Sequence, residues 1–142
     1  MAKPSVELLR GVRLFAAVDD RFLERLASEF TTRGYAAGET LAGEGESGRT
    51  LIVIETGRVT VTVHGEEVGQ LGPGDAFGEM SLIDKSARSA TVKADTDVQA
   101  HQLPVWSFRP LIQGHPEVAW SLLEALAERV RAAEGRGTRP GA

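Results

Sequence analysis

The sequence predicts a mainly β domain with helices at both ends, and two observations lead to this fold class. From residue 31 to residue 103, apolar side chains recur at the two-residue period of β-strands, and glycine turns interrupt the chain every several residues. In residues 5–30 and 104–134, apolar side chains recur instead at helical spacing. Many short strands joined by glycine turns favour a sandwich or a jelly roll.

Composition restricts the possible function classes. The chain has 142 residues, of which 42% are hydrophobic and 25% charged, as in an ordinary globular domain. Its formal net charge of −4, without a cluster of Lys and Arg, argues against binding of nucleic acid or an anionic membrane by this chain. The absence of cysteine excludes disulfides and cysteine-ligated metal sites. No apolar run is long enough to span a bilayer and the N-terminus lacks a signal-peptide core, so we expect a cytoplasmic protein.

The first thirty residues predict two helices packed on the β body. Ser5 is a suitable N-cap for a short first helix, and Asp19 is one for the second. Val18 before this cap and Leu23 after it suit a hydrophobic staple. The apolar face of the second helix consists of Phe22, Leu23, Leu26 and Phe30. We expect packing from this region and no chemistry.

The central region predicts several short strands. Residues 51–54 form a continuous apolar strand, whereas the valines at 59, 61 and 63 alternate with threonines and predict a half-buried strand. His64 and Gly65 form the predicted tip of a hairpin, and residues 71–75 form a glycine- and proline-rich turn.

The C-terminal region predicts two helices and a tail. A short helix is expected from Pro104, and Pro116 then occupies a tolerated first-turn position of the last helix, which ends at Gly135. We expect one apolar stripe on this helix, formed by Ala119, Leu122, Leu123, Leu126, Val130 and Ala133. Residues 1–134 thus form a single domain, and the tail at 135–142 is rich in Gly, Arg and Pro and is predicted to be disordered.

Residues 77–92 contain the groups that could hold a small anion carrying hydroxyls. Backbone amides in the turn after Gly78 can point at a phosphate, as they do at a helix N-terminus. Arg88 adds a planar, permanently charged fork that matches phosphate oxygens, and Ser89 offers a hydroxyl donor beside it. Glu79 is an acceptor-only group that suits a ribose hydroxyl.

This segment resembles the phosphate-binding cassette of cyclic-nucleotide-binding domains, the module shared by catabolite activator proteins, protein kinase A regulatory subunits and cyclic-nucleotide-gated channels. The resemblance lies in Phe-Gly-Glu-Met-Ser-Leu at 77–82, followed after five residues by Arg-Ser-Ala-Thr-Val-Lys-Ala at 88–94. Ala87 departs from the pattern, because many members have proline there. Residues 45–57 resemble the early glycine signature of the family, and residues 108–116 resemble its hinge and lid helices.

The resemblance implies the full architecture. It is a jelly-roll β-roll at 31–103 with the cassette at 77–92, N-terminal helices at 5–30, and C-terminal hinge and lid helices at 104–134.

The resemblance also implies a set of ligand-binding residues. Arg88 binds the exocyclic phosphate, Ser89 and the amide of Ala90 assist it, and Glu79 binds the ribose 2′-hydroxyl. The complete implied set is Phe77, Gly78, Glu79, Met80, Ser81, Arg88, Ser89 and Ala90. Contacts from the lid helix to the base are expected at Arg129, Arg131 or Ala133, although Ala133 offers no hydrogen-bonding side chain.

We therefore expect a regulatory sensor that binds cAMP, or cGMP less favourably, since cGMP-preferring relatives tend to carry threonine at the place of Ser89. Binding would reposition the last helix and signal to an unidentified protein effector, and a homodimer is a further possibility. We expect no enzymatic activity, cofactor or metal. Two alternatives are an interaction module that retains only the fold, and a cupin-like metal enzyme, for which the scattered His64, His101 and His115 are unsuited.

Overall fold

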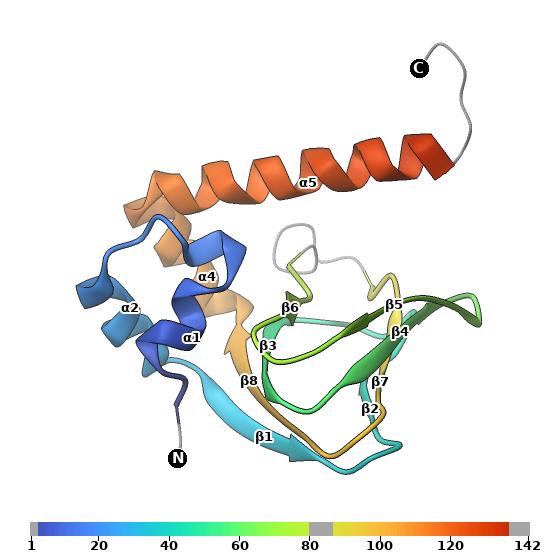
Figure 1. The fold of residues 1–142 in the computed structure, drawn as a ribbon. Coiled ribbons are helices and arrows are strands. Elements are labelled where there is room, and N and C mark those ends of the chain that lie inside the picture. The colour runs from blue at the N-terminus through green and yellow to red at the C-terminus, as the bar shows by residue number, and fades with distance from the viewer. Residues whose placement is uncertain (1–2, 80–86, 137–142) are drawn as a thin grey trace.

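The computed structural model describes residues 3–79 and 87–136, and every structural statement below concerns these residues. Two antiparallel sheets face each other, and the helices lie at one end and across the top (Figure 1). The strands are β1 (Thr31–Tyr35), β2 (Thr40–Ala42), β3 (Thr50–Thr56), β4 (Val59–Val63), β5 (Glu66–Leu71), β6 (Ala76–Phe77), β7 (Thr91–Ala94) and β8 (Val98–Pro104). Their orders are β1-β8-β3-β6 and β2-β7-β4-β5. The predicted β-roll with flanking helices is confirmed.

Both predicted N-caps are confirmed. The Ser5 hydroxyl accepts a hydrogen bond from the amide of Leu8 at 3.1 Å at the start of α1 (Val6–Arg10). The Asp19 carboxylate accepts one from the amide of Phe22 at 2.8 Å at the start of α2 (Asp20–Ala27). A short 3-10 helix, η1 (Arg13–Phe15), lies between them. Phe30 is buried as expected, but it reaches the core from beyond the end of α2.

Strand β3 is buried on both faces because it separates two cores. Leu51 and Val53 face the N- and C-terminal helices, whereas Ile52 and Ile54 face the second sheet. This division follows from the alternation of side chains along a strand, and it explains the continuous apolar run in the sequence. Register pairs Val53 with His101 on β8, so His101 faces the helical side and is fully buried.

Strand β4 differs from the simple alternation that its sequence predicts. Val59 is fully buried, but residues 60–63 are all partly buried. Val61 on this strand lines a pocket, so it is less covered than a core residue. The predicted hairpin tip is confirmed, because His64 and Gly65 join β4 to β5 with positive φ angles of 54° and 83°.

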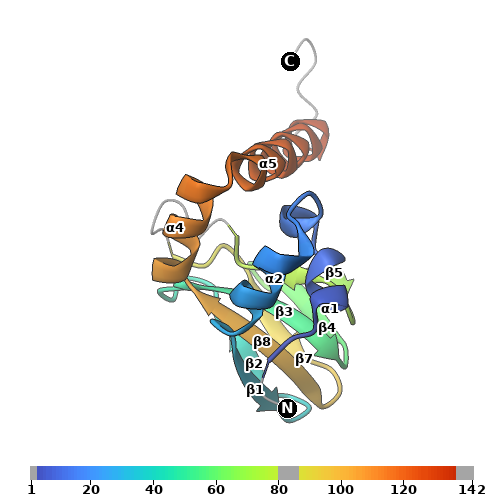
Figure 2. The same cartoon turned by 90° about the vertical axis from the view of Figure 1, so that its left-hand side faces the viewer.

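The C-terminal helices are α4 (Val105–Gly114) and α5 (Pro116–Arg136). Figure 2 shows that α4 leads from the end of β8 to α5, which then extends across the top of the domain. The predicted helix end at Gly135 lies one residue early, since α5 continues through this glycine to Arg136. The remainder of the predicted tail, residues 137–142, lies outside the described residues.

The apolar stripe predicted on α5 is covered by the domain only in part. Leu122 is buried and Leu126 packs partly against the core, but Leu123 and Val130 are each 56% exposed and Ala133 is exposed. The reason is geometric, because α5 lies on the domain through one side only (Figure 1). The predicted residues lie within about 100° around the helix axis, but only Leu122 and Leu126 reach the core, and every residue from 127 to 135 is exposed.

Truncation of the core between the helices and β3 should destabilise the domain strongly. Phe15 is 0% exposed, and Phe15→Ala should lower the free energy of unfolding by about 3–5 kcal/mol through lost burial and a cavity. Trp106→Ala is the matched control, because Trp106 is 72% exposed and its loss should change the free energy by no more than about 0.5 kcal/mol. Urea unfolding followed by circular dichroism measures both values, and equal effects would contradict the assignment of this core.

Candidate functional site

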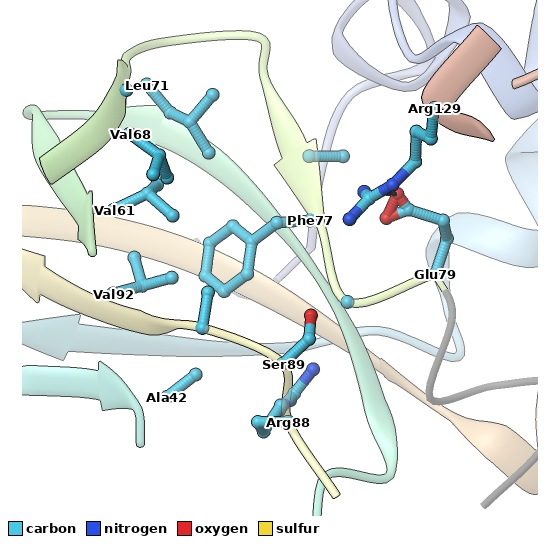
Figure 3. Close-up of a pocket in the computed structure, with 14 residues that line it drawn as sticks. Ala42, Val61, Val68, Leu71, Phe77, Glu79, Arg88, Ser89, Val92 and Arg129 are labelled. Atoms are coloured by element: carbon cyan, nitrogen blue, oxygen red, sulfur yellow. Dashed lines mark hydrogen bonds and ion pairs between the residues drawn. The ribbon is translucent and has the colours of Figure 1, made fainter. Parts of the chain in front are cut away.

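A pocket of about 290 Å³ lies between the second sheet, the segment after β6 and α5 (Figure 3). Its floor comes from β2, β4, β5 and β7, its rim from residues 77–79 and 88–90, and α5 contributes one side chain. The lining residues are Ala42, Val61, Val68, Gly69, Leu71, Ala76, Phe77, Gly78, Glu79, Arg88, Ser89, Ala90, Val92 and Arg129. Apolar and charged groups thus meet in one concave site, as is typical of small-molecule sites.

Arg88 is fixed in the wall of this pocket with one unused donor. Its Nη2 donates to the Thr50 hydroxyl at 3.1 Å, and its backbone amide donates to the Glu46 carbonyl at 2.8 Å. Its Nη1 is buried and has no hydrogen-bond partner among the described residues. Burial lowers the pKa of Arg88, and the negative charge of Glu79 partly opposes this effect. A desolvated guanidinium with a free N–H group is a strong anion-binding group.

Two glycines make room for this guanidinium. Gly48 lies against the Arg88 side chain so closely that a Cβ atom there would overlap Nε. Gly78 has a φ of +96°, which L side chains rarely adopt, and its Cβ would lie 2.5 Å from Arg88 Nη1 and 2.6 Å from the Thr50 carbonyl oxygen. The turn after β6 therefore brings its backbone close to Arg88 only because residue 78 is glycine.

Glu79 and Arg129 face each other across the mouth of the pocket (Figure 3). Arg129 Nη1 lies 3.5 Å from Glu79 Oε2, and the Glu79 side chain is only 18% exposed. This contact connects α5 to the segment after β6. Because Glu79 has a second carboxylate oxygen, it can accept a further hydrogen bond from a ligand hydroxyl.

A second ion pair holds α5 in place. The Arg13 guanidinium donates to both carboxylate oxygens of Glu128 at 2.5 and 3.0 Å, which connects η1 to α5. The hydrogen bonds with Arg13 lower the pKa of Glu128, and the same contact raises the pKa of Arg13. The stabilisation is therefore present above the unfolded pKa of Glu128 and is lost as the pH falls through its lower folded value.

The apolar part of the pocket is a wall of aliphatic and aromatic side chains. Val61, Leu71, Phe77 and Val92 line it, and Val68 lies at its edge with 61% exposure (Figure 3). Such a wall suits a flat, weakly polar ring system. Of these residues, the sequence analysis identified only Phe77 as part of the site. The valine alternation of β4 was visible in the sequence, but it could not show that the inner face of the strand lines a pocket.

The structure brings together most of the residues that the sequence nominated. Those that line the pocket are Phe77, Gly78, Glu79, Arg88, Ser89, Ala90 and Arg129. Met80 and Ser81 lie outside the described residues. Arg131 and Ala133 are exposed on α5 and do not belong to the described lining, so of the three nominated lid positions only Arg129 faces the pocket.

The three histidines lie apart from one another and do not form a metal centre. Each one contacts a glutamate in a different part of the domain: His64 with Glu44, His101 with Glu55, and His115 with Glu117. His101 also contacts the Thr32 hydroxyl at 2.9 Å through Nδ1. Across the described ranges, no three His, Asp or Glu side chains gather where they could hold a metal ion.

None of the described helices is long and apolar enough to cross a membrane.

Comparisons of the sequence and of the structure with known proteins identify the same family. A family model for the cyclic nucleotide-binding domain matches residues 32–115. The cyclic AMP receptor protein of Thermus thermophilus is 33% identical over 131 residues, which cover 89% of this chain and 61% of that protein. The curated relatives that it matches are longer, and the chain spans 18% to 61% of their length.

Two solved structures have the same fold. The N-terminal domain of a transcriptional regulator from Streptomyces coelicolor has a TM-score of 0.74 and 34% identity, with 90% of this chain and 95% of that chain covered. The regulatory domain of Toxoplasma gondii PKA, crystallised with cAMP, has a TM-score of 0.69 and 29% identity, with 74% and 42% covered.

Substitution of Gly78 should reveal how closely the backbone approaches Arg88. Gly78→Ala should destabilise the domain by about 1–3 kcal/mol more than Gly45→Ala, because both positions have positive φ but only Gly78 lacks space for a Cβ. Chemical unfolding of the two variants measures the difference. Equal destabilisation would show that backbone conformation alone requires glycine at residue 78.

Proposed function

Because this chain belongs to the cyclic nucleotide-binding domain family, we propose that it is a sensor that binds cAMP in preference to cGMP and repositions α5 in response. The observation that carries this proposal is the buried Nη1 of Arg88, a cationic donor without a partner among the described residues, at the wall of a pocket. A phosphate oxygen would satisfy this donor and neutralise the buried charge.

The three parts of a cyclic nucleotide match three parts of the pocket. The phosphate would bind Arg88 and Ser89, with the amides of Ala90 and of the turn after Gly78 completing its shell. The ribose 2′-hydroxyl would donate to Glu79. The purine would lie against the apolar wall beneath α5. Met80 and Ser81 remain part of the proposed phosphate shell.

Two observations support the proposed preference for cAMP over cGMP. Ser89 is adjacent to Arg88 and supplies the smaller hydroxyl group, whereas the resemblance associates threonine with cGMP. The related regulatory domain of Toxoplasma gondii PKA was crystallised with cAMP at 29% identity. We assign no catalytic step to this chain, and its effector would be a separate protein or domain.

The Arg129–Glu79 contact supports a response of α5 to the ligand. Glu79 is the proposed ribose acceptor and is also the partner of α5 at 3.5 Å. A ligand that contacts Glu79 and fills the pocket beneath Arg129 would change the contacts of both. Such a ligand would shift α5 only if it binds more tightly to one position of the helix than to another. The Arg129–Glu79 ion pair is a contact that can differ between the two positions and so produce this difference in affinity.

Calorimetric titration of the purified domain with cAMP and with cGMP tests the proposal. We expect one site per chain, tighter binding of cAMP, and roughly 10- to 150-fold weaker binding by Arg88→Ala through loss of a charge-assisted contact. Arg21→Ala removes an equal charge from an exposed position on α2 and should leave the affinity unchanged. If neither nucleotide binds the wild-type protein at high micromolar concentration, the sensor function is wrong and an interaction module becomes the better hypothesis.

Arg129 and Arg131 form a matched pair for testing the response of α5. Arg129→Ala should weaken cAMP binding about 2- to 5-fold, in the range of an exposed ion pair, and should reduce the ligand-dependent change of amide exchange in residues 126–136. Arg131→Ala removes the same charge two residues away, outside the described lining of the pocket, and should do neither. Equal effects of both variants would mean that α5 acts through its overall charge and not through this contact.

A further inference from the structure

The guanidinium group of Arg88 is held so that one of its nitrogens is left for a ligand. Nη2 donates to the Thr50 hydroxyl at 3.1 Å. Gly48 lies so close to Nε that a Cβ atom on it would overlap this nitrogen. Nη1 has no partner among the described residues and lies beside Gly78, which lines the pocket. Nη1 is therefore the nitrogen that a bound anion would satisfy.

The contact with Thr50 limits how Arg88 can recognise a phosphate. An arginine with two free nitrogens on one edge forms a fork that pairs with two oxygens of the same phosphate. A guanidinium group has two such edges, Nη1 with Nη2 and Nε with Nη2, and Nη2 belongs to both. Because Thr50 already accepts a hydrogen bond from Nη2, either fork is complete only if the ligand shares this nitrogen with Thr50.

The charge of the pocket matches a single negative charge. The charged residues of the described lining are Arg88, Arg129 and Glu79, two cations and one anion, and Arg129 is already paired with Glu79 at 3.5 Å. The phosphodiester of a cyclic nucleotide carries one negative charge, whereas a phosphomonoester carries about −1.5 to −2 at pH 7. The second charge of a monoester would lack a partner in the described lining, which is unfavourable in a site partly removed from water.

We propose that Thr50 is a positioning residue that makes this pocket selective for phosphodiesters over phosphomonoesters. The inference rests on the function proposed above, because it concerns the same pocket. By holding Nη2, Thr50 leaves Arg88 with a contact that satisfies a singly charged phosphate but not a doubly charged one. The selectivity arises because the wrong ligand keeps an unpaired charge. Thr50 does not belong to the described lining, so its effect passes through Arg88.

The surroundings of Thr50 hold its hydroxyl in place. Thr50 is the first residue of β3 and pairs with Pro104 on β8. Its carbonyl oxygen lies close to the turn after β6, only 2.6 Å from where a Cβ atom of Gly78 would be. Threonine is also branched at Cβ, which restricts its side-chain rotation. A hydroxyl fixed in this way can hold the guanidinium group of Arg88 in one orientation.

Calorimetric titration of the full chain with cAMP and with 5′-AMP tests the role of Thr50. The wild-type protein should bind cAMP at least about 30-fold more tightly than 5′-AMP. Thr50→Val keeps the shape of the side chain but frees Nη2 to form a fork with two oxygens of the monoester, so this ratio should fall at least about 5-fold. Thr50→Ser keeps the hydroxyl and should retain the wild-type ratio. A purely structural role of Thr50 would weaken the binding of both nucleotides equally.

Thr62→Val is the matched control for this substitution. Thr62 is a partly buried residue of β4 outside the described lining of the pocket, so the loss of its hydroxyl should leave the ratio unchanged. Circular dichroism of each variant establishes that it is folded. An unchanged ratio in Thr50→Val overturns the role of Thr50 but leaves the sensor function intact. If the wild-type protein binds neither nucleotide, the proposed function itself is wrong, and the selectivity with it.

A second ligand pair tests the charge argument on the wild-type protein without any substitution. 5′-AMP and its phosphate monomethyl ester share the base, the ribose and an open-chain phosphate, but the methyl ester is a phosphodiester with a single negative charge. At neutral pH the methyl ester should bind at least about 5-fold more tightly than 5′-AMP, in spite of its added methyl group. Equal or weaker binding of the methyl ester would mean that the pocket recognises the closed ring and not the charge, which would overturn the proposal.

Discussion

The charge and shape of the pocket wall depend on the burial of one guanidinium group, that of Arg88. Removing Arg88 from water disfavours its charged form, and this burial lowers the pKa of the guanidinium. The Thr50 hydroxyl and the charge of Glu79 offset part of the cost, while Gly48 and Gly78 supply the space. The remaining donor is still unmatched among the described residues. Under the proposed function, a bound phosphate would pair with this donor and offset part of the remaining cost of burying the charge.

Features set by neighbouring residues could be predicted from the sequence, and features set by distant contacts could not. The side chains of Ser5 and Asp19 each accept a hydrogen bond from a backbone amide only three residues away, and both caps were predicted. The Arg88–Thr50 contact joins residues 38 positions apart, so its geometry was invisible even though Arg88 itself was identified. For the lid, the sequence offered three positions, and only the docking of α5 decides that Arg129 faces the pocket.

The partial coverage of the apolar stripe of α5 has the same origin. Periodicity gives the angular position of each side chain around a helix, but it does not say which angle meets the domain. Leu122 and Leu123 are adjacent in the sequence and differ by about 100° around the axis, yet one is buried and the other is exposed. The sequence pattern alone could not show how much of the apolar stripe the domain covers.

Neighbouring residues of α5 determine how the helix is rotated about its axis. Glu128 contacts Arg13 on η1 and Arg129 contacts Glu79 beside the pocket, so two adjacent positions are held from different directions. A ligand that changes the Arg129–Glu79 contact would therefore change one of the two contacts that hold α5. Under the function proposed above, nucleotide binding and the position of α5 are linked equilibria, so the factor by which the nucleotide favours one position of the helix is the factor by which that position favours the nucleotide.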